Sequence, residues 1–228
     1  SEDYLNLKRA VLRMSSFPFT PRVFSEARLL EVASGAANLL PDVIRPAVAQ
    51  LTALGADSQD AAVVDLVLDA AYLRHYLALA RGVDAPMVLS WATERVLNKA
   101  ISALWRAFRA RINRKDLQQY FLPIDGITGI LADMIEAGEP HAWGSIIPGR
   151  IGDVYREASE SPEEERICRF EHLASNYLTQ MARLTKLQTA GPERVAGFLW
   201  GVWVEAFNMK LVISGKLNHI DPDVLKGR

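Results

Sequence analysis

The sequence predicts an all-α protein built from repeated long helical hairpins. Apolar residues recur every three or four positions through most of the chain, which is the spacing of one face of an α-helix. No cluster of β-branched residues is bounded by turn residues, so strand signals are nearly absent. Short breaks that contain Gly and Pro separate the periodic segments, and these breaks predict where the helices end.

Composition excludes several classes of protein. The 228 residues are 50% hydrophobic and carry a formal net charge of −1, so no global field attracts nucleic acid or an anionic membrane. The single Cys168 excludes an intramolecular disulfide and a one-chain cysteine zinc site. The longest apolar run, residues 195–204, is about half of a membrane span and is followed by Glu205. We therefore expect a soluble, cytoplasmic protein that does not cross a bilayer.

The first third of the chain is expected to contain short helices. Thr20-Pro21 has the pattern of an N-cap followed by proline at the first helical position, and Gly35 follows the end of that helix. A shorter helix is expected between Pro41 and Gly55.

A long hairpin follows. Residues 58–81 and 84–112 both keep the helical period, and Asp84 is expected to cap the second segment. Only Gly82 and Val83 separate the two helices, so they must pack antiparallel.

The second half of the chain is expected to begin with short helices and a loop and to end in another long hairpin. Residues 138–149 are rich in Gly and Pro and are predicted to be a loop. Gly191-Pro192 separates the two long helices of the second hairpin. The helices expected in this half are residues 115–120, 127–137, 149–158, 161–189 and 192–214.

The last of these helices is unusually apolar. One series of apolar residues advances by alternating steps of four and three, and aromatic residues cover much of the remaining surface. We expect this helix to be buried from more than one direction, with Trp200, Trp203 and Phe207 in the core; a hydrophobic partner groove is the alternative. The alternating series is Val195, Leu199, Val202, Ala206, Met209 and Ile213.

The hairpins look like copies of one module. Asn6, Asn98 and Asn208 recur about every hundred residues, each followed closely by lysine within a helix. This spacing predicts three modules: residues 1–34 as the remnant of the first, 35–140 as the second and 141–228 as the third. The first module would then lack most of its repeat.

This pattern resembles the C-subunit family of the V-type and A-type rotary ATPases, whose member in the eukaryotic enzyme is the d-subunit. The resemblance covers nearly the whole chain. The stretches that carry it are Asp3-Tyr4-Leu5-Asn6-Leu7-Lys8, Val64-Asp65-Leu66-Val67-Leu68-Asp69-Ala70-Ala71-Tyr72, Glu205-Ala206-Phe207-Asn208-Met209-Lys210, Ile213-Ser214-Gly215-Lys216 and His219-Ile220-Asp221-Pro222-Asp223.

The resemblance implies a fold, a function and partners. Three helical modules would surround an open funnel with pseudo-threefold symmetry. The chain would be a non-catalytic central-stalk connector that couples the rotor shaft to the membrane rotor ring during ATP-driven transport of protons or sodium ions. Its partners would be the central shaft subunits and the ring, and it would lie peripherally on the inner face of the membrane. The alternative is a soluble helical adaptor or regulator unrelated to the ATPase.

Four arginines form the strongest charged feature. Arg106, Arg109, Arg111 and Arg114 lie near the end of one predicted helix, where cations complement the helix dipole. They are also the candidate partner-binding residues, for an acidic protein surface or lipid headgroups. A nucleic-acid interpretation, with Trp105 as a stacking platform, is less favoured, and we expect no nucleic-acid partner.

The sequence shows no catalytic, cofactor or metal motif. Asp65 and Asp69 share a helical face near His75, but no Glu-x-x-His lies on another helix to complete a bundle-type metal site. We expect these acids to be solvated or to form salt bridges between helices. The sequence therefore predicts no enzyme activity, no cofactor, no metal and no direct small-molecule substrate.

Overall fold

Each secondary-structure element in the part of the chain that the structure describes is a helix, which confirms the predicted fold class. The structure is a computed structural model that describes residues 2–12, 14, 24–33, 42, 44–53, 61–121 and 123–220. The predicted helix boundaries at Thr20-Pro21, Gly35, Pro41 and Gly55 and the stretch 221–223 lie outside the described residues.

The helices follow the predicted order closely. The first half contains α1 (Glu2–Val11), α2 (Glu26–Ala33), α3 (Arg45–Ala53), α4 (Ala61–Arg81) and α5 (Pro86–Arg109). The second half contains α6 (Arg114–Asp116), the π-helical turn η3 (Leu117–Phe121), α7 (Thr128–Ala137), the 3₁₀ helix η4 (Pro140–Ser145), α8 (Gly149–Ser159), α9 (Glu163–Leu184), the 3₁₀ turn η5 (Thr185–Leu187) and α10 (Pro192–Leu217).

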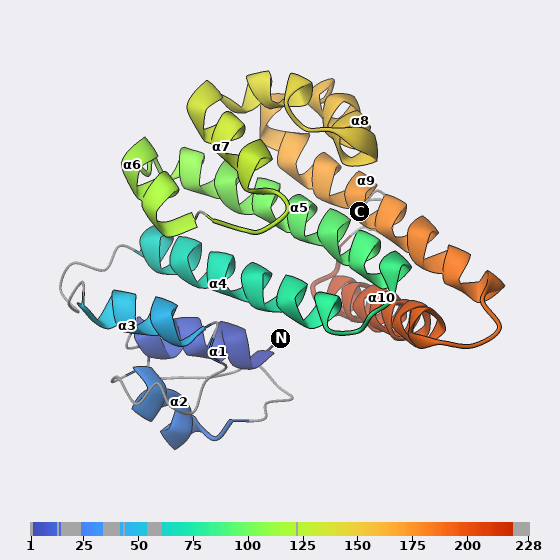
Figure 1. Ribbon diagram of the computed structural model, residues 1–228, viewed down its shortest axis with the longest axis horizontal. Helices are drawn as coiled ribbons and strands as arrows, with labels where there is room; N and C mark the ends of the chain where they lie inside the picture. Colours follow the sequence, from blue (N-terminus) through green and yellow to red (C-terminus); the bar gives the residue numbers. More distant parts are fainter. Residues whose placement is uncertain are drawn as a thin grey trace.

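The antiparallel pair α4 and α5 forms the centre of the molecule, as the short break between them predicts (Figure 1). α9 and α8 lie against α5 on one side, whereas α1 and α3 lie against the other face of α4, and α2 packs on α1 and α3 (Figure 1). Two apolar cores result. The larger is centred on α5 and contains Ile101, Leu104 and Phe170. The smaller joins α1 to α4 around Leu51 and Leu68.

Two local predictions are wrong. Asp84 does not cap α5: it adopts a left-handed backbone with φ of 53°, and Ala85 is the N-cap without a side-chain hydrogen bond. The predicted loop 138–149 contains η4, because Trp143 is completely buried there. Its indole Nε1 donates to the Met134 carbonyl at 3.0 Å, which fixes the segment against α7.

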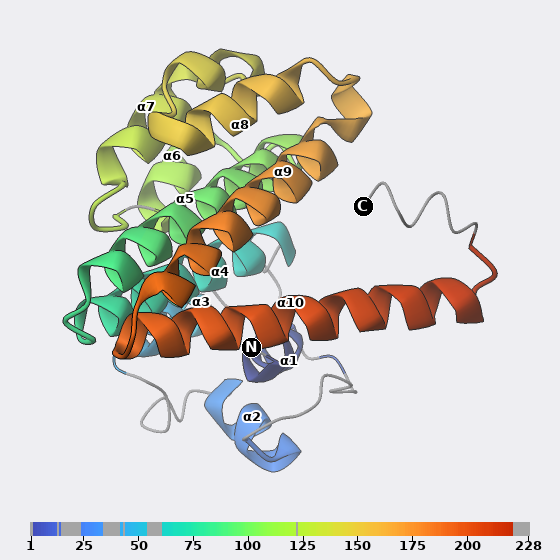
Figure 2. The same cartoon turned by 90° about the vertical axis from the view of Figure 1, so that its right-hand side faces the viewer.

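α10 diverges from the rest of the molecule. Its N-terminal end lies beside the end of α9, and from there the two helices open into a V (Figure 2). The second predicted hairpin is therefore packed only near its turn, around Leu178, Ala182 and Trp200. Most of the length of α10 projects beyond the two main cores.

Candidate partner-binding surfaces

The four predicted arginines are all exposed, but they have different surroundings. Arg114 is engaged within the chain. Its Nη1 contacts Glu136 Oε1 at 2.9 Å, and its Nη2 donates to the Glu136 carbonyl at 2.7 Å. This guanidinium ties α6 to the end of α7, so its first role is structural.

Arg106 belongs to a charge network that crosses four helices. Its guanidinium lies 3.4 Å from Asp69 Oδ2 of α4 and 3.9 Å from Glu171 Oε1 of α9. Lys8 Nζ of α1 contacts the same Asp69 at 2.8 Å, and it contacts Asp65 at 2.9 Å. The expectation that Asp65 and Asp69 form salt bridges between helices is confirmed. The network links helices that are far apart in the sequence.

Arg109 and Arg111 are left to face outward. Among the described residues, neither guanidinium lies within 4.0 Å of a carboxylate. Both line a groove of about 760 Å³ between the end of α5 and the start of α9. The apolar floor of the groove includes Trp105 and Phe108, and its other lining residues are Glu139, Pro140, His141, Glu163, Glu164 and Arg166. The groove therefore places three arginines and three glutamates around an aromatic floor, and Arg109 and Arg111 are the cations at the end of α5.

A second surface surrounds α10, which is attached to the body by one close approach. Gly197 of α10 lies so near to α9 and η5 that a Cβ atom would overlap Thr185 Oγ1 and come within 2.9 Å of the Ala182 carbonyl. One turn along, Trp200 Nε1 donates to Thr179 Oγ1 at 3.1 Å. The lack of a side chain at Gly197 is therefore what allows Trp200 to reach α9.

Aromatic rings strengthen the same attachment. Trp200 of α10 meets Trp91 of α5 edge to face, with ring centroids 4.9 Å apart. The Arg95 guanidinium lies 4.7 Å from the Trp200 ring and 5.5 Å from the Trp203 ring. A cation over aromatic faces contributes about 0.5–2 kcal/mol, depending on desolvation. Arg95 thus holds the base of α10 against α5.

The remaining surface of α10 is apolar and exposed. Trp200 and Gly215 are its buried residues, whereas Trp203 is 46% exposed and Phe207 is 53% exposed. The expectation that α10 is buried from more than one direction is wrong, and only Trp200 of the three predicted core aromatics is in the core. By length and composition α10 could also span a membrane, and just 6% of its most apolar window is buried. The other exposed apolar residues of α10 are Val195, Phe198, Leu199, Val202, Met209, Val212, Ile213 and Leu217.

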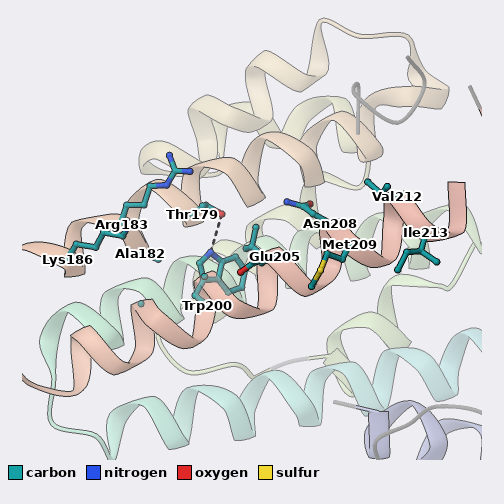
Figure 3. Close-up of a pocket in the computed structure, with 13 residues that line it drawn as sticks. Thr179, Ala182, Arg183, Lys186, Trp200, Glu205, Asn208, Met209, Val212 and Ile213 are labelled. Carbon is teal, nitrogen blue, oxygen red and sulfur yellow. Dashed lines mark hydrogen bonds between the residues drawn. The ribbon is translucent and has the colours of Figure 1, made fainter. Parts of the chain in front are cut away.

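A groove of about 590 Å³ lies in the V between α9 and α10 (Figure 3). Arg183 of α9 and Lys186 of η5 lie near the closed end (Figure 3). Asn208 and Val212 of α10 lie toward the open end. The lining is mostly apolar, with a few polar groups at its edges. Such a groove suits the side chains of another macromolecule.

The chemistry of these surfaces is that of recognition. The described residues contain no group of three or more His, Cys, Asp or Glu side chains that could hold a metal ion. The Arg109 groove and the α9–α10 groove instead combine apolar floors with exposed charges, which is the composition of protein interfaces. Sequence reasoning found the arginines but missed the α9–α10 groove. Gly197, within an apolar helix, was the available signal of a close approach.

The comparisons with known proteins agree with this picture. Residues 27–228 match the family model described as the ATP synthase (C/AC39) subunit. Neither the search of curated proteins nor the search of solved structures gave a match. The family match covers far more than half of the chain. The chain therefore belongs to the C/AC39 subunit family of the V-type and A-type rotary ATPases.

Proposed function

We propose that this chain is a non-catalytic central-stalk connector, which couples the rotor shaft of a V/A-type ATPase to the membrane rotor ring during ATP-driven transport of protons or sodium ions. The observation that carries the proposal is the family match over residues 27–228. Membership in that family makes the chain a subunit of a rotary ATPase. The coupling role is our inference from the physical character of the helices.

A connector that transmits torque must resist deformation, and the centre of this molecule is suited to that task. α4, α5 and α9 are long helices packed along their lengths, and close-packed interiors have low compressibility. The network of Lys8, Asp69, Arg106 and Glu171 adds polar ties between α1, α4, α5 and α9. Displacing one of these helices would break contacts to at least one other.

The proposed partners are the central shaft subunits and the rotor ring. In this proposal the three modules, residues 1–34, 35–140 and 141–228, contribute to a pseudo-threefold funnel that receives the foot of the shaft. The chain would lie peripherally on the cytoplasmic face of the membrane and would have no chemical step of its own. Its mechanism would consist of shape and stiffness.

Arg109 and Arg111 are the proposed contact with an acidic partner surface. They are the two members of the arginine cluster that have no carboxylate partner among the described residues, and they lie beside the Trp105 and Phe108 surface. Arg106 and Arg114 already contact carboxylates of this chain, so their removal would also weaken the fold. A clean test must therefore separate the two pairs.

The test is assembly with a complex of the shaft subunits and rotor ring from the same enzyme. Wild-type protein is expected to bind that complex in a pull-down, and the double variant Arg109→Ser/Arg111→Ser is expected to bind at least about tenfold more weakly. The control is Arg150→Ser/Arg169→Ser, which removes two exposed charges elsewhere together with their ion pairs to Asp153 and Glu157, so it disturbs the fold at least as much as the test variant. Equal binding of the two double variants would show that Arg109 and Arg111 do not form the proposed contact. Failure of the wild-type protein to bind would contradict the proposed connector role.

A further inference from the structure

The exposed side of α10 carries an ordered pattern that the connector role does not use. The residues of α10 that face the body are Gly197, Trp200 and Val204. The series Val195, Leu199, Val202, Ala206, Met209 and Ile213 is centred on the opposite side of the helix, since it is offset from them by about half a turn. Met209 and Ile213 lie at its edge and also line the α9–α10 groove. All six residues are exposed.

The spacing of this series is that of a coiled-coil seam. Steps of four and three place Leu199, Ala206 and Ile213 at a positions and Val195, Val202 and Met209 at d positions of three consecutive heptads. The exposed fraction of the five larger side chains lies between 48% and 59%. An uninterrupted apolar a/d seam that its own protein leaves about half exposed predicts a second helix along it. At 1.5 Å per residue, α10 offers about 39 Å of helix for that purpose.

The residues beside the seam distinguish between possible partners. In a parallel pair, each g residue faces the e residue five positions later in the other helix. In α10 the three g–e pairs between two copies would be Phe198 with Trp203, Glu205 with Lys210, and Val212 with Leu217. Two pairs are apolar and the third is of opposite charge. The helix is therefore complementary to itself in the parallel orientation.

The antiparallel orientation lacks this complementarity. There g faces g and e faces e, so the Glu205 carboxylates of the two helices would approach each other near the dyad. Like charges that face each other are destabilising. The parallel orientation leaves room for both bodies, because Gly197 and Trp200, which contact α9 and α5, project from the side of α10 opposite the centre of the seam.

We propose that α10 is a dimerisation surface and that, in the isolated protein, its seam is covered by α10 of a second copy in a parallel two-stranded coiled coil. Glu205 and Lys210 set the orientation, and the a and d residues supply the buried apolar surface. The proposal goes beyond the connector role and does not depend on it. It also gives the apolar face of α10 an occupant when the ATPase partners are absent.

The first test is the mass of the purified chain in sedimentation analysis across a wide range of concentration. We expect twice the chain mass of 25.3 kDa. Glu205→Lys and Lys210→Glu should each weaken the dimer about tenfold, and the double variant should restore it. Glu205 and Lys210 are both exposed, so circular dichroism and the melting temperature of the monomer should not change. A monomer at every concentration would overturn the proposal. Binding of that monomer to phospholipid vesicles would show that the apolar face of α10 contacts lipid and not a second copy.

The second test determines the orientation. In a Cys168→Ser background, which removes the exposed native thiol, Ala206→Cys should form a disulfide-linked dimer on mild oxidation. Identical a positions lie directly opposite each other in a parallel pair, within reach of a disulfide. In the antiparallel pair, position 206 would instead face position 202. When the Ala206→Cys and Val202→Cys proteins are mixed, a disulfide that forms between the two variants in preference to one between identical variants would therefore refute the parallel arrangement.

Discussion

Adding a single methyl group at Gly197 should detach α10, whereas the same addition one turn later should not. In Gly197→Ala the new Cβ would overlap Thr185 Oγ1 and approach the Ala182 carbonyl to 2.9 Å. A carbonyl of α9 cannot rotate away, so α10 must shift outward. At Gly201 a Cβ atom would have no neighbour within 4 Å, which makes Gly201→Ala the matched control.

The size of the effect follows from what the shift disturbs. Trp200 is 6% exposed, and its indole contacts Trp91 and Thr179. Overpacking of this kind costs about 1–3 kcal/mol. We therefore expect Gly197→Ala to lower the free energy of unfolding by about 1–3 kcal/mol, which is about 2–12 °C in melting temperature for a chain of this size. Gly201→Ala should instead raise it by about 0.5–1 kcal/mol, because alanine is the better helix former.

The assay is thermal and urea unfolding followed by circular dichroism, together with tryptophan fluorescence in the folded state. Gly197→Ala should also shift the emission to longer wavelength, because Trp200 becomes more hydrated, and Gly201→Ala should leave the emission unchanged. Equal stability changes of the same sign in both variants would refute the proposed attachment. They would show that the two glycines act only through helix propensity.

Three other predictions test the fold and its electrostatics. Asp69→Asn should destabilise the protein by about 1–3 kcal/mol in urea unfolding, because it weakens contacts to Lys8, whose side chain is 13% exposed. Asp65→Asn should cost less than about 1 kcal/mol, because the Asp65 side chain is 55% exposed; equal losses would contradict the network. Burial raises the pKa of Glu94 above its usual 4.5, so the folded state binds the proton of this carboxyl more tightly than the unfolded state does. The contribution of Glu94 to the free energy of unfolding therefore falls as the pH rises through the pKa of the folded state. Glu94→Gln should therefore stabilise the protein near neutral pH and have little effect below pH 4.5, and the opposite pH dependence in melting curves would refute this assignment. Trp143→Phe, which loses the hydrogen bond to the carbonyl of Met134, should lower the unfolding free energy by about 1–3 kcal/mol and accelerate amide exchange in η4; unchanged exchange would contradict the anchoring role.

Most of the fold could be predicted from the sequence because long helices have a strong periodic signal. The four longest, α4, α5, α9 and α10, were all expected within a few residues of their observed ends. η4 was missed, because the Pro and Gly residues of this segment, such as Pro140 and Gly144, predict a loop when only the local sequence is considered. What orders this segment is Trp143, whose burial depends on α7 and α8, and no local pattern reports such contacts.

The surfaces were harder to predict than the helices. The apolar residues of α10 indicated burial, but a sequence pattern cannot tell whether the covering surface belongs to the same chain. The sequence identified the four clustered arginines, but it could not show which of them contact carboxylates of the same chain. Arg106 contacts acids on α4 and α9, and Arg114 contacts Glu136, so their roles depend on tertiary neighbours distant in sequence. The pseudo-threefold funnel and the module boundaries stay predictions.

The coupling role is tested most directly by measuring ATP hydrolysis and ATP-driven ion transport in the same vesicles, with the rotary ATPase assembled with and without this chain. Our account predicts that hydrolysis by the soluble head persists without the chain, that ion transport is lost, and that adding the wild-type chain restores transport. Ion transport at an undiminished rate without the chain would contradict the proposed function.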